Sequence, residues 1–236
     1  MKAKDRLIFA LDVLNLEKAM PLLDQLEGKV GLVKVNSLAA AFPVIVGMIQ
    51  DRGIEVWRDW KHHDIPGTVA SFITADVETR LAMTTVHTLG GPKMLEYAAG
   101  AAKGSNLKIL GITILTSHDQ EGFNKEIGIP GSIQDKVVNL ATMAEKAGLA
   151  GVVSSAKEAK MLRAKLQPGT LIVTPGIKPT WAAKRADQAR ITTPYQAILD
   201  GADYLVVGSA IRKSENPGEA ADKIVAEIEK ALSEKA

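Results

Sequence analysis

The feature that most constrains the fold of this 236-residue chain is a regular alternation of short aliphatic runs with amphipathic helical patterns. Most of the runs are nearly free of polar residues, as expected for strands buried on both faces of a parallel sheet. We predict strands at 6–12, 31–35, 54–59, 83–87, 107–114, 151–154, 170–174 and 204–208.

Helical patterns separate these strands, and several begin with a capping residue such as Asn15 or with proline. We predict helices at 16–26, 43–52, 68–80, 92–102, 132–147, 156–166, 193–199 and 217–234. Eight strand–helix units at roughly 30 residues each favour a (β/α)8 TIM barrel over an open, doubly wound sheet. With no repeat or linker in the chain, we expect a single domain over residues 1–236.

Composition excludes several classes of function. The chain has no cysteine, which rules out disulfides, a thiolate nucleophile and Cys-ligated metals. A net charge of +2 gives no sign of nucleic-acid binding. The most apolar stretch, 38–49, is interrupted by Pro43 and Gly47 and is too short for a membrane span, and no secretory signal is evident, so we expect a cytoplasmic protein.

Charged residues gather where the predicted strands end, and in a barrel the carboxyl ends of the strands carry the chemistry. The densest group is Asp59-Trp60-Lys61-His62-His63-Asp64. On an extended strand Asp59 and Lys61 share a face, and a lysine between carboxylates stays protonated and can act as an acid. The alternative is a solvated surface cluster of ion pairs. A metal site at His62, His63 and Asp64 is disfavoured because consecutive side chains splay apart.

Motifs along nearly the whole chain resemble those of the orotidine 5'-monophosphate decarboxylase family. The motifs, in order, are Phe9-Ala10-Leu11-Asp12, Lys34-Val35, Asp59-x-Lys61-x-x-Asp64-Ile65-Pro66, Leu115-Thr116-Ser117, Thr174-Pro175-Gly176-Ile177 and Gly201-Ala202-Asp203-Tyr204-Leu205-Val206-Val207-Gly208. The Asp-x-Lys-x-x-Asp motif also occurs in sugar-phosphate decarboxylases and hexulose-phosphate synthases. The complete ordered set is more specific.

The resemblance implies a lyase that converts orotidine monophosphate to UMP and CO2 without a metal or organic cofactor. Its catalytic tetrad would be Lys34, Asp59, Lys61 and Asp64, with Lys61 protonating the C6 carbanion. The enzyme would be a homodimer, with Asp64 and Thr68 reaching the partner's site. Other substrate contacts would come from Asp12, Ser117, Pro175, Lys178, Gln188, Gly208 and Ser209.

The chain departs from the family pattern at the phosphate end, where Ser209 replaces the arginine that grips the substrate phosphate. Loss of charge-assisted hydrogen bonds worth about 1.5–3 kcal/mol each predicts impaired activity. Lys178 and Gln188 are retained candidates for phosphate binding, and Arg212 is a possible substitute that we expect to point elsewhere.

Two further departures lie near the tetrad, where Asn36 replaces a glycine and Gly67 an asparagine. The apolar stretch 38–49, with Trp57, Trp60 and Phe72, is too apolar for a free surface, which indicates a buried dimer contact. An alternative interpretation is an engineered scaffold with a redesigned active site or subunit interface, serving as a designed catalyst, binder or assembly without the native activity.

Overall fold

All eight predicted strands are present in the computed structural model, which describes residues 1–182 and 192–235. The strands are parallel where they pair and follow one another in chain order as a closed barrel, so the prediction of a (β/α)8 barrel is confirmed. They are β1 (Leu7–Ala10), β2 (Leu32–Val35), β3 (Glu55–His62), β4 (Met83–His87), β5 (Lys108–Ile112), β6 (Gly151–Val153), β7 (Leu171–Thr174) and β8 (Tyr204–Val207).

The predicted helices are also present, with shifts of a few residues at their ends. They are α1 (Leu16–Leu26), α3 (Ile45–Gln50), α4 (Pro66–Glu78), α5 (Gly91–Ala101), α7 (Ile133–Lys146), α8 (Ala156–Arg163), α9 (Pro194–Leu199) and α11 (Pro217–Lys235). Short helices that the sequence pattern did not predict are α2 (Ser37–Ala41), α6 (Gln120–Lys125), α10 (Ser209–Arg212) and the 3-10 turns η1 (Ala3–Arg6), η2 (Thr88–Gly90) and η3 (Thr180–Ala182).

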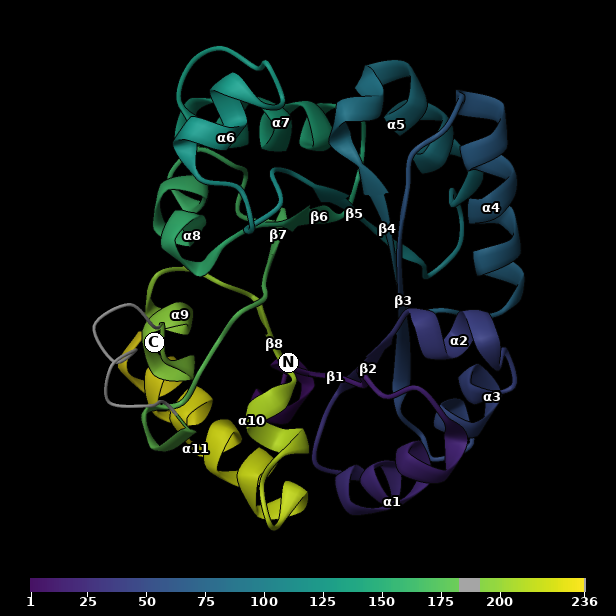
Figure 1. Cartoon of the computed structure of the whole chain (residues 1–236), viewed down its shortest axis with the longest axis vertical. Coiled ribbons are helices and arrows are strands. Elements are labelled where there is room, and N and C mark those ends of the chain that lie inside the picture. Colours follow the sequence, from purple (N-terminus) through teal and green to yellow (C-terminus); the bar gives the residue numbers. More distant parts are fainter. Residues whose placement is uncertain (183–191, 236) are drawn as a thin grey trace. The chain divides into compact units, whose positions relative to one another are not determined.

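The chain divides into two compact units, a terminal unit (1–59 and 174–236) and a central unit (60–173). In the terminal unit, β1 pairs with both β2 and β8, and β2 pairs with β3. Every residue of β1, β2 and β8 is buried, as the aliphatic runs predicted. Helices α1, α3 and α11 lie on one side of these strands (Figure 1).

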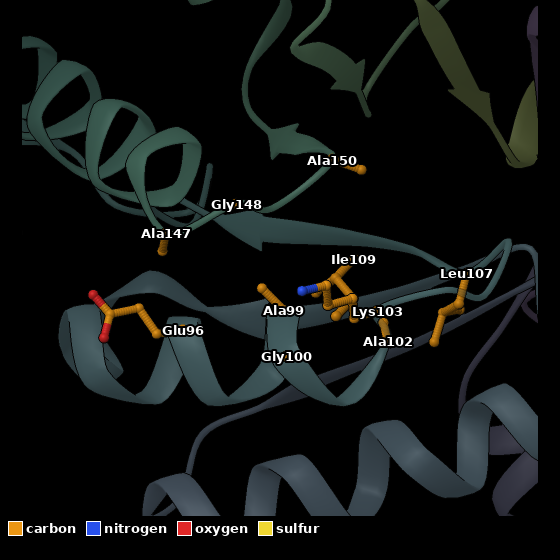
Figure 2. A pocket seen from close by; sticks show the side chains of 10 residues that line it. All are labelled: Glu96, Ala99, Gly100, Ala102, Lys103, Leu107, Ile109, Ala147, Gly148 and Ala150. Carbon is orange, nitrogen blue, oxygen red and sulfur yellow. The ribbon is translucent and has the colours of Figure 1, made fainter.

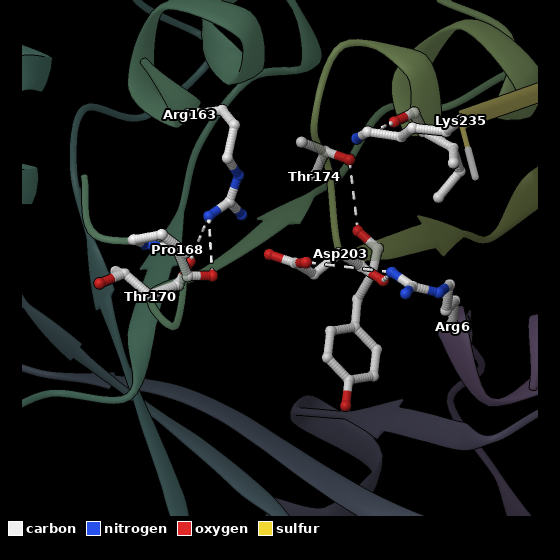
Figure 3. Close-up of polar contacts among 9 residues, drawn as sticks. Arg6, Arg163, Pro168, Thr170, Thr174, Asp203 and Lys235 are labelled. Carbon is white, nitrogen blue, oxygen red and sulfur yellow. Dashed lines mark hydrogen bonds and ion pairs between the residues drawn. The ribbon is translucent and has the colours of Figure 1, made fainter. Parts of the chain in front are cut away.

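Polar contacts fasten the start of β8 within the terminal unit. Arg6 donates from Nη1 to the carbonyl of Asp203 at 3.1 Å, and Thr174 donates from Oγ1 to the carbonyl of Tyr204 at 3.3 Å. Figure 3 shows both contacts, together with the bond from Lys235 of α11 to the carbonyl of Ile198. Thr174 at the end of β7 is therefore bonded to the start of β8, and α11 is bonded to α9.

In the central unit, β4, β5, β6 and β7 pair in sequence, and α4, α5, α7 and α8 lie on one side of them (Figure 1). The loop before β7 is held by Arg163, whose Nη1 donates to the carbonyl of Thr170 at 3.1 Å (Figure 3). Among the described residues, no helix combines the length and the apolarity needed to cross a bilayer.

Part of the apolar stretch 38–49, and Trp57 with it, is covered by the chain's own core rather than left for a partner subunit, whereas residues 40–44 of the same stretch are exposed. Trp57 is 1% exposed, and Leu38, Ile45 and Ile49 are equally buried, because the chain's own core covers them. Phe72 of α4 is different, with 49% of its surface exposed.

Candidate functional site

In the terminal unit, three charged residues meet at the carboxyl ends of β1, β2 and β3. Lys34 lies in β2, opposite Ala10 of β1 and Trp57 of β3. Its Nζ lies 3.6 Å from Asp12 Oδ1 and 3.6 Å from Asp59 Oδ2. The parallel register brings these residues together: Asp12 follows β1, Lys34 is the third of the four residues of β2, and Asp59 lies in the second half of β3.

Burial makes this cluster unusual. Lys34 is 8% exposed as a residue, and the Asp59 side chain is 9% exposed, whereas that of Asp12 is 52% exposed. Charged groups removed from water are rarely found without a partner of opposite charge, because desolvation costs several kcal/mol per ion. The two carboxylates compensate the buried ammonium and fix its position, which is the arrangement expected of a preorganised polar site.

Lys61, near the end of β3, has a backbone conformation that the sequence did not predict. Its φ is +53°, in the left-handed region that residues with a side chain seldom adopt. The regular extended backbone assumed for the Asp59-x-Lys61 pattern is therefore interrupted at Lys61. The Lys61 N–H donates to Thr85 Oγ1 of β4 at 2.9 Å. The sequence interpretation missed Thr85, which is fully buried.

Asp64 and Thr68 lie just beyond, where β3 leads into α4. Asp64 is exposed, and its Oδ1 accepts a hydrogen bond from the Ile65 N–H at 2.6 Å. Thr68 lies in the first turn of α4 and is partly exposed. Pro66 begins this helix and fixes the direction in which the chain leaves the site.

Two histidines stack in the same part of the central unit. The rings of His63 and His87, the last residue of β4, have centroids 5.3 Å apart. Burial lowers the pKa of His87 below its usual value of 6.5, and charge on His63 and then on Lys61 lowers it further. His87 Nδ1 also accepts from the Leu89 N–H at 3.4 Å, which requires that nitrogen to be unprotonated. His87 ends the strand predicted at 83–87, and the sequence interpretation gave it no role.

The remaining predicted contacts lie on loops at the ends of their strands. Ser117 is exposed after β5, while Pro175 and Lys178 follow β7. Gly208 follows β8, and a Cβ at this position would lie only 3.3 Å from the Ala10 Cβ, so its backbone lies close to the end of β1. Gln188 lies outside the described residues.

A cavity of about 610 Å³ opens at the ends of β7 and β8 in the terminal unit. It is lined by residues that include Lys178, Trp181, Ser209, Lys213 and Lys223. Ser209 and Lys213 are four residues apart, and the Lys213 N–H donates to the Ser209 carbonyl, which places both on one side of the helical turn. The sequence interpretation missed Lys213, although this spacing could have found it. Arg212 is not among the described residues that line the cavity.

A second cavity, of about 530 Å³, lies in the central unit (Figure 2). Small and aliphatic side chains line it, with Glu96 and Lys103 as its charged members. It sits beside Leu107, Ile109 and Ala150, at the amino ends of β5 and β6, away from the strand ends that carry the predicted site. Within residues 1–182 and 192–235, no three His, Asp or Glu side chains form a group suited to a metal ion.

Comparisons with known proteins agree with this arrangement. Residues 5–224 match the family model described as "Orotidine 5'-phosphate decarboxylase / HUMPS family". The chain is 40% identical to the orotidine 5'-phosphate decarboxylase of Moorella thermoacetica over 97% of this chain and 94% of that protein. It is 42% identical to that of Syntrophotalea carbinolica, with 99% of each chain covered.

Solved structures give the same result. The crystal structure of orotidine 5'-phosphate decarboxylase from Lactobacillus acidophilus superposes with a TM-score of 0.83 at 30% identity, covering 94% of this chain and 98% of that one. None of these matches supports the alternative of an engineered scaffold. The family match covers most of the chain, and the two relatives cover nearly all of it; the chain therefore belongs to the orotidine 5'-phosphate decarboxylase / HUMPS family.

Proposed function

We propose that this protein decarboxylates orotidine 5'-monophosphate to UMP and CO2, the last step of UMP synthesis. The observation that carries the proposal is the buried cluster of Lys34 with Asp12 and Asp59, followed two residues later by Lys61 in a constrained conformation. The relatives named above support this activity rather than another chemistry on the same barrel.

The reaction requires a bond to break and a proton to be supplied. The bond between C6 and the carboxylate breaks, CO2 leaves, and the electron pair stays on C6. The Lys61 ammonium donates its proton to C6 and is reprotonated from water. Fixed charges that stabilise developing charge lower the barrier without reorganisation, and Lys34, held by its ion pairs, is such a charge.

The other predicted residues bind the substrate in this proposal. Asp12 and Lys34 contact the ribose and Ser117 the pyrimidine. The phosphate occupies the cavity at the ends of β7 and β8, where Lys178 and Ser209 lie. Backbone groups near Pro175 and Gly208 and the side chain of Gln188 complete the predicted phosphate contacts, in the region where barrels commonly bind phosphate.

A homodimer is part of the same proposal, with Asp64 and Thr68 of each chain reaching the partner's site. Its support is the apolar surface around these residues, since Ile65 is 69% and Phe72 49% exposed. Apolar side chains that the chain itself leaves uncovered are typical of subunit interfaces.

The test is the loss of the ultraviolet absorbance of orotidine monophosphate on addition of the purified protein. We expect turnover that Lys61→Ala abolishes and that Lys146→Ala, an exposed lysine of α7, leaves unchanged. No turnover at millimolar substrate would overturn the proposed function. Equal rates in the two variants would remove Lys61 from the mechanism.

A further inference from the structure

Lys61 adopts a left-handed backbone although it is not glycine, and such a conformation persists only where the surroundings hold it. The first residue that restrains this backbone is Thr85, whose hydroxyl oxygen accepts a hydrogen bond from the Lys61 N–H at 2.9 Å. Thr85 is fully buried in the middle of β4, so this acceptor is itself immobile. One hydrogen bond fixes the amide of Lys61 but not the direction in which the chain continues.

The second restraint on this backbone is the docking of the next side chain, His62. Its ring stacks on Phe72 of α4, with centroids 4.8 Å apart and planes 13° from parallel. Its Nε2 lies 3.6 Å from Asp76 Oδ2, and the His62 side chain is 12% exposed. Phe72 and Asp76 are four residues apart and share one face of α4. His62 is therefore docked on a single helix face by two contacts.

Asp76 is itself fixed. The residue is 2% exposed, and its Oδ2 accepts from Thr84 Oγ1 of β4 at 2.6 Å. Thr84 and Thr85 are consecutive, so their side chains point to opposite faces of β4. One threonine holds the Lys61 amide and the other, through Asp76, holds His62.

The geometry points to His62 as a positioning residue for Lys61. Its docking against Phe72 and Asp76 fixes the chain immediately after Lys61, and Thr85 fixes the amide at Lys61, so that the left-handed turn is maintained and the ammonium is aimed. Nε2 of His62 is buried and has no hydrogen-bond partner among the described residues, so its contact with α4 consists of the stacking on Phe72 and the approach to Asp76. The role of Lys61 in this inference rests on the proposed function, whereas the hold on its backbone does not.

The experiment compares His62→Ala and Thr85→Val with the wild-type protein. Misplacement of a reacting group by about 1 Å can cost a hundredfold in rate. We expect kcat to fall about ten- to hundredfold in each variant, with little change in KM. The double variant His62→Phe/Asp76→Leu replaces the polar docking by an apolar one and removes the buried Asp76 carboxylate together with its histidine partner, so it should recover most of the lost kcat.

The control is Thr170→Val, which removes the hydroxyl of a different threonine, one that donates to the Glu145 carboxylate just before β7 begins. It should lower the melting temperature without changing kcat. If His62→Ala does the same, its role is only structural and the inference is overturned. The inference is likewise overturned if the double variant stays as slow as His62→Ala.

A second readout is independent of turnover. In protein labelled with 15N at lysine, the coupling between the amide and α protons of Lys61 reports its φ, and Lys61→Arg identifies its signal. We expect the coupling to shift toward the extended-backbone value in His62→Ala and Thr85→Val but not in Thr170→Val. If the coupling is unchanged in both His62→Ala and Thr85→Val, the inference that these two residues restrain the Lys61 backbone is overturned. If the wild-type protein shows no turnover, the proposed function is refuted. The coupling measurement still tests whether His62 and Thr85 restrain the Lys61 backbone.

Discussion

Replacing Lys34 by methionine removes the buried positive charge of the strand-end cluster and keeps most of the side chain's volume. The ammonium lies 3.6 Å from each of two carboxylates. At an effective dielectric constant of about 20, each contact corresponds to an attraction of about 5 kcal/mol. Most of this is offset by desolvation, and exposure of the Asp12 side chain screens its share further.

The net cost comes from Asp59, whose side chain is 9% exposed and loses this compensating charge. Breaking a buried ion pair by removing one partner costs about 3–5 kcal/mol. We therefore expect Lys34→Met to lower the free energy of unfolding by about 3 kcal/mol. The assay is urea denaturation followed by circular dichroism, at one protein concentration throughout, because dimerisation would link stability to concentration.

The matched control is Lys29→Met, which breaks an ion pair with Asp222 on the surface of the same unit. Both side chains of that pair are substantially exposed, so the loss should be at most about 1 kcal/mol. Adding Asp59→Asn to Lys34→Met should recover part of the stability, because the side chain that has lost the Lys34 charge is then neutral. If Lys34→Met lowers the free energy of unfolding no more than Lys29→Met does, the cluster is effectively solvated and Lys34 does not compensate a buried Asp59 charge.

Three further predictions concern pH, phosphate binding and assembly. Burial lowers the folded-state pKa of His87, so the unfolded chain binds the proton more readily and the stability of the protein should fall as pH drops below about 6.5. The urea midpoint, measured at two pH values, should fall less in His87→Gln than in the wild-type protein, and an equal fall in both would contradict this prediction. Ser209→Arg should tighten UMP binding roughly 10- to 150-fold in calorimetry, as one or more charge-assisted hydrogen bonds imply, whereas Ser233→Arg on α11 should not. If the two variants bind UMP with equal affinity, the phosphate binds elsewhere. Phe72→Asp should yield monomers in sedimentation and Ile127→Asp should not, and an intact Phe72→Asp dimer would place the interface elsewhere.

The barrel could be predicted because its signals are local. Helix α1 begins where Asn15 predicted, and the Asn15 side chain accepts from the Lys18 N–H at 3.0 Å. Strand β4 has the predicted bounds, and its sequence, Met83 to His87, includes two threonines and a valine, which are β-branched residues that favour strands. The carboxyl end of β2 was predicted correctly, whereas the strand predicted to reach Asp12 ends at Ala10. The meeting of Asp12 with Lys34 still follows from the fold class, because neighbouring parallel strands bring their carboxyl ends together.

Other features could not be predicted, for identifiable reasons. Helix α2 lies in an alanine-rich run before Pro43 and is capped by Asn36, one of the departures from the family pattern. Helix α6 is only six residues long, and its glycine-rich surroundings indicated a loop, although Asp119 caps it. The left-handed conformation of Lys61 depends on Thr85, 24 residues later in the chain, and no local property of lysine indicates it.

Two restraints act on the lysines of the proposed mechanism, one at a side chain and one at a backbone. Lys34 is held at its ammonium by Asp12 and Asp59, which suits a group that keeps its charge throughout the reaction. Lys61 is restrained at its backbone, because its N–H donates to Thr85 and the next side chain, His62, is docked on α4. A proton donor has to be placed accurately against the atom that it protonates, and a restrained backbone contributes to that placement. The fold thus supplies a fixed charge through a side-chain ion pair and a positioned proton donor through a restrained backbone.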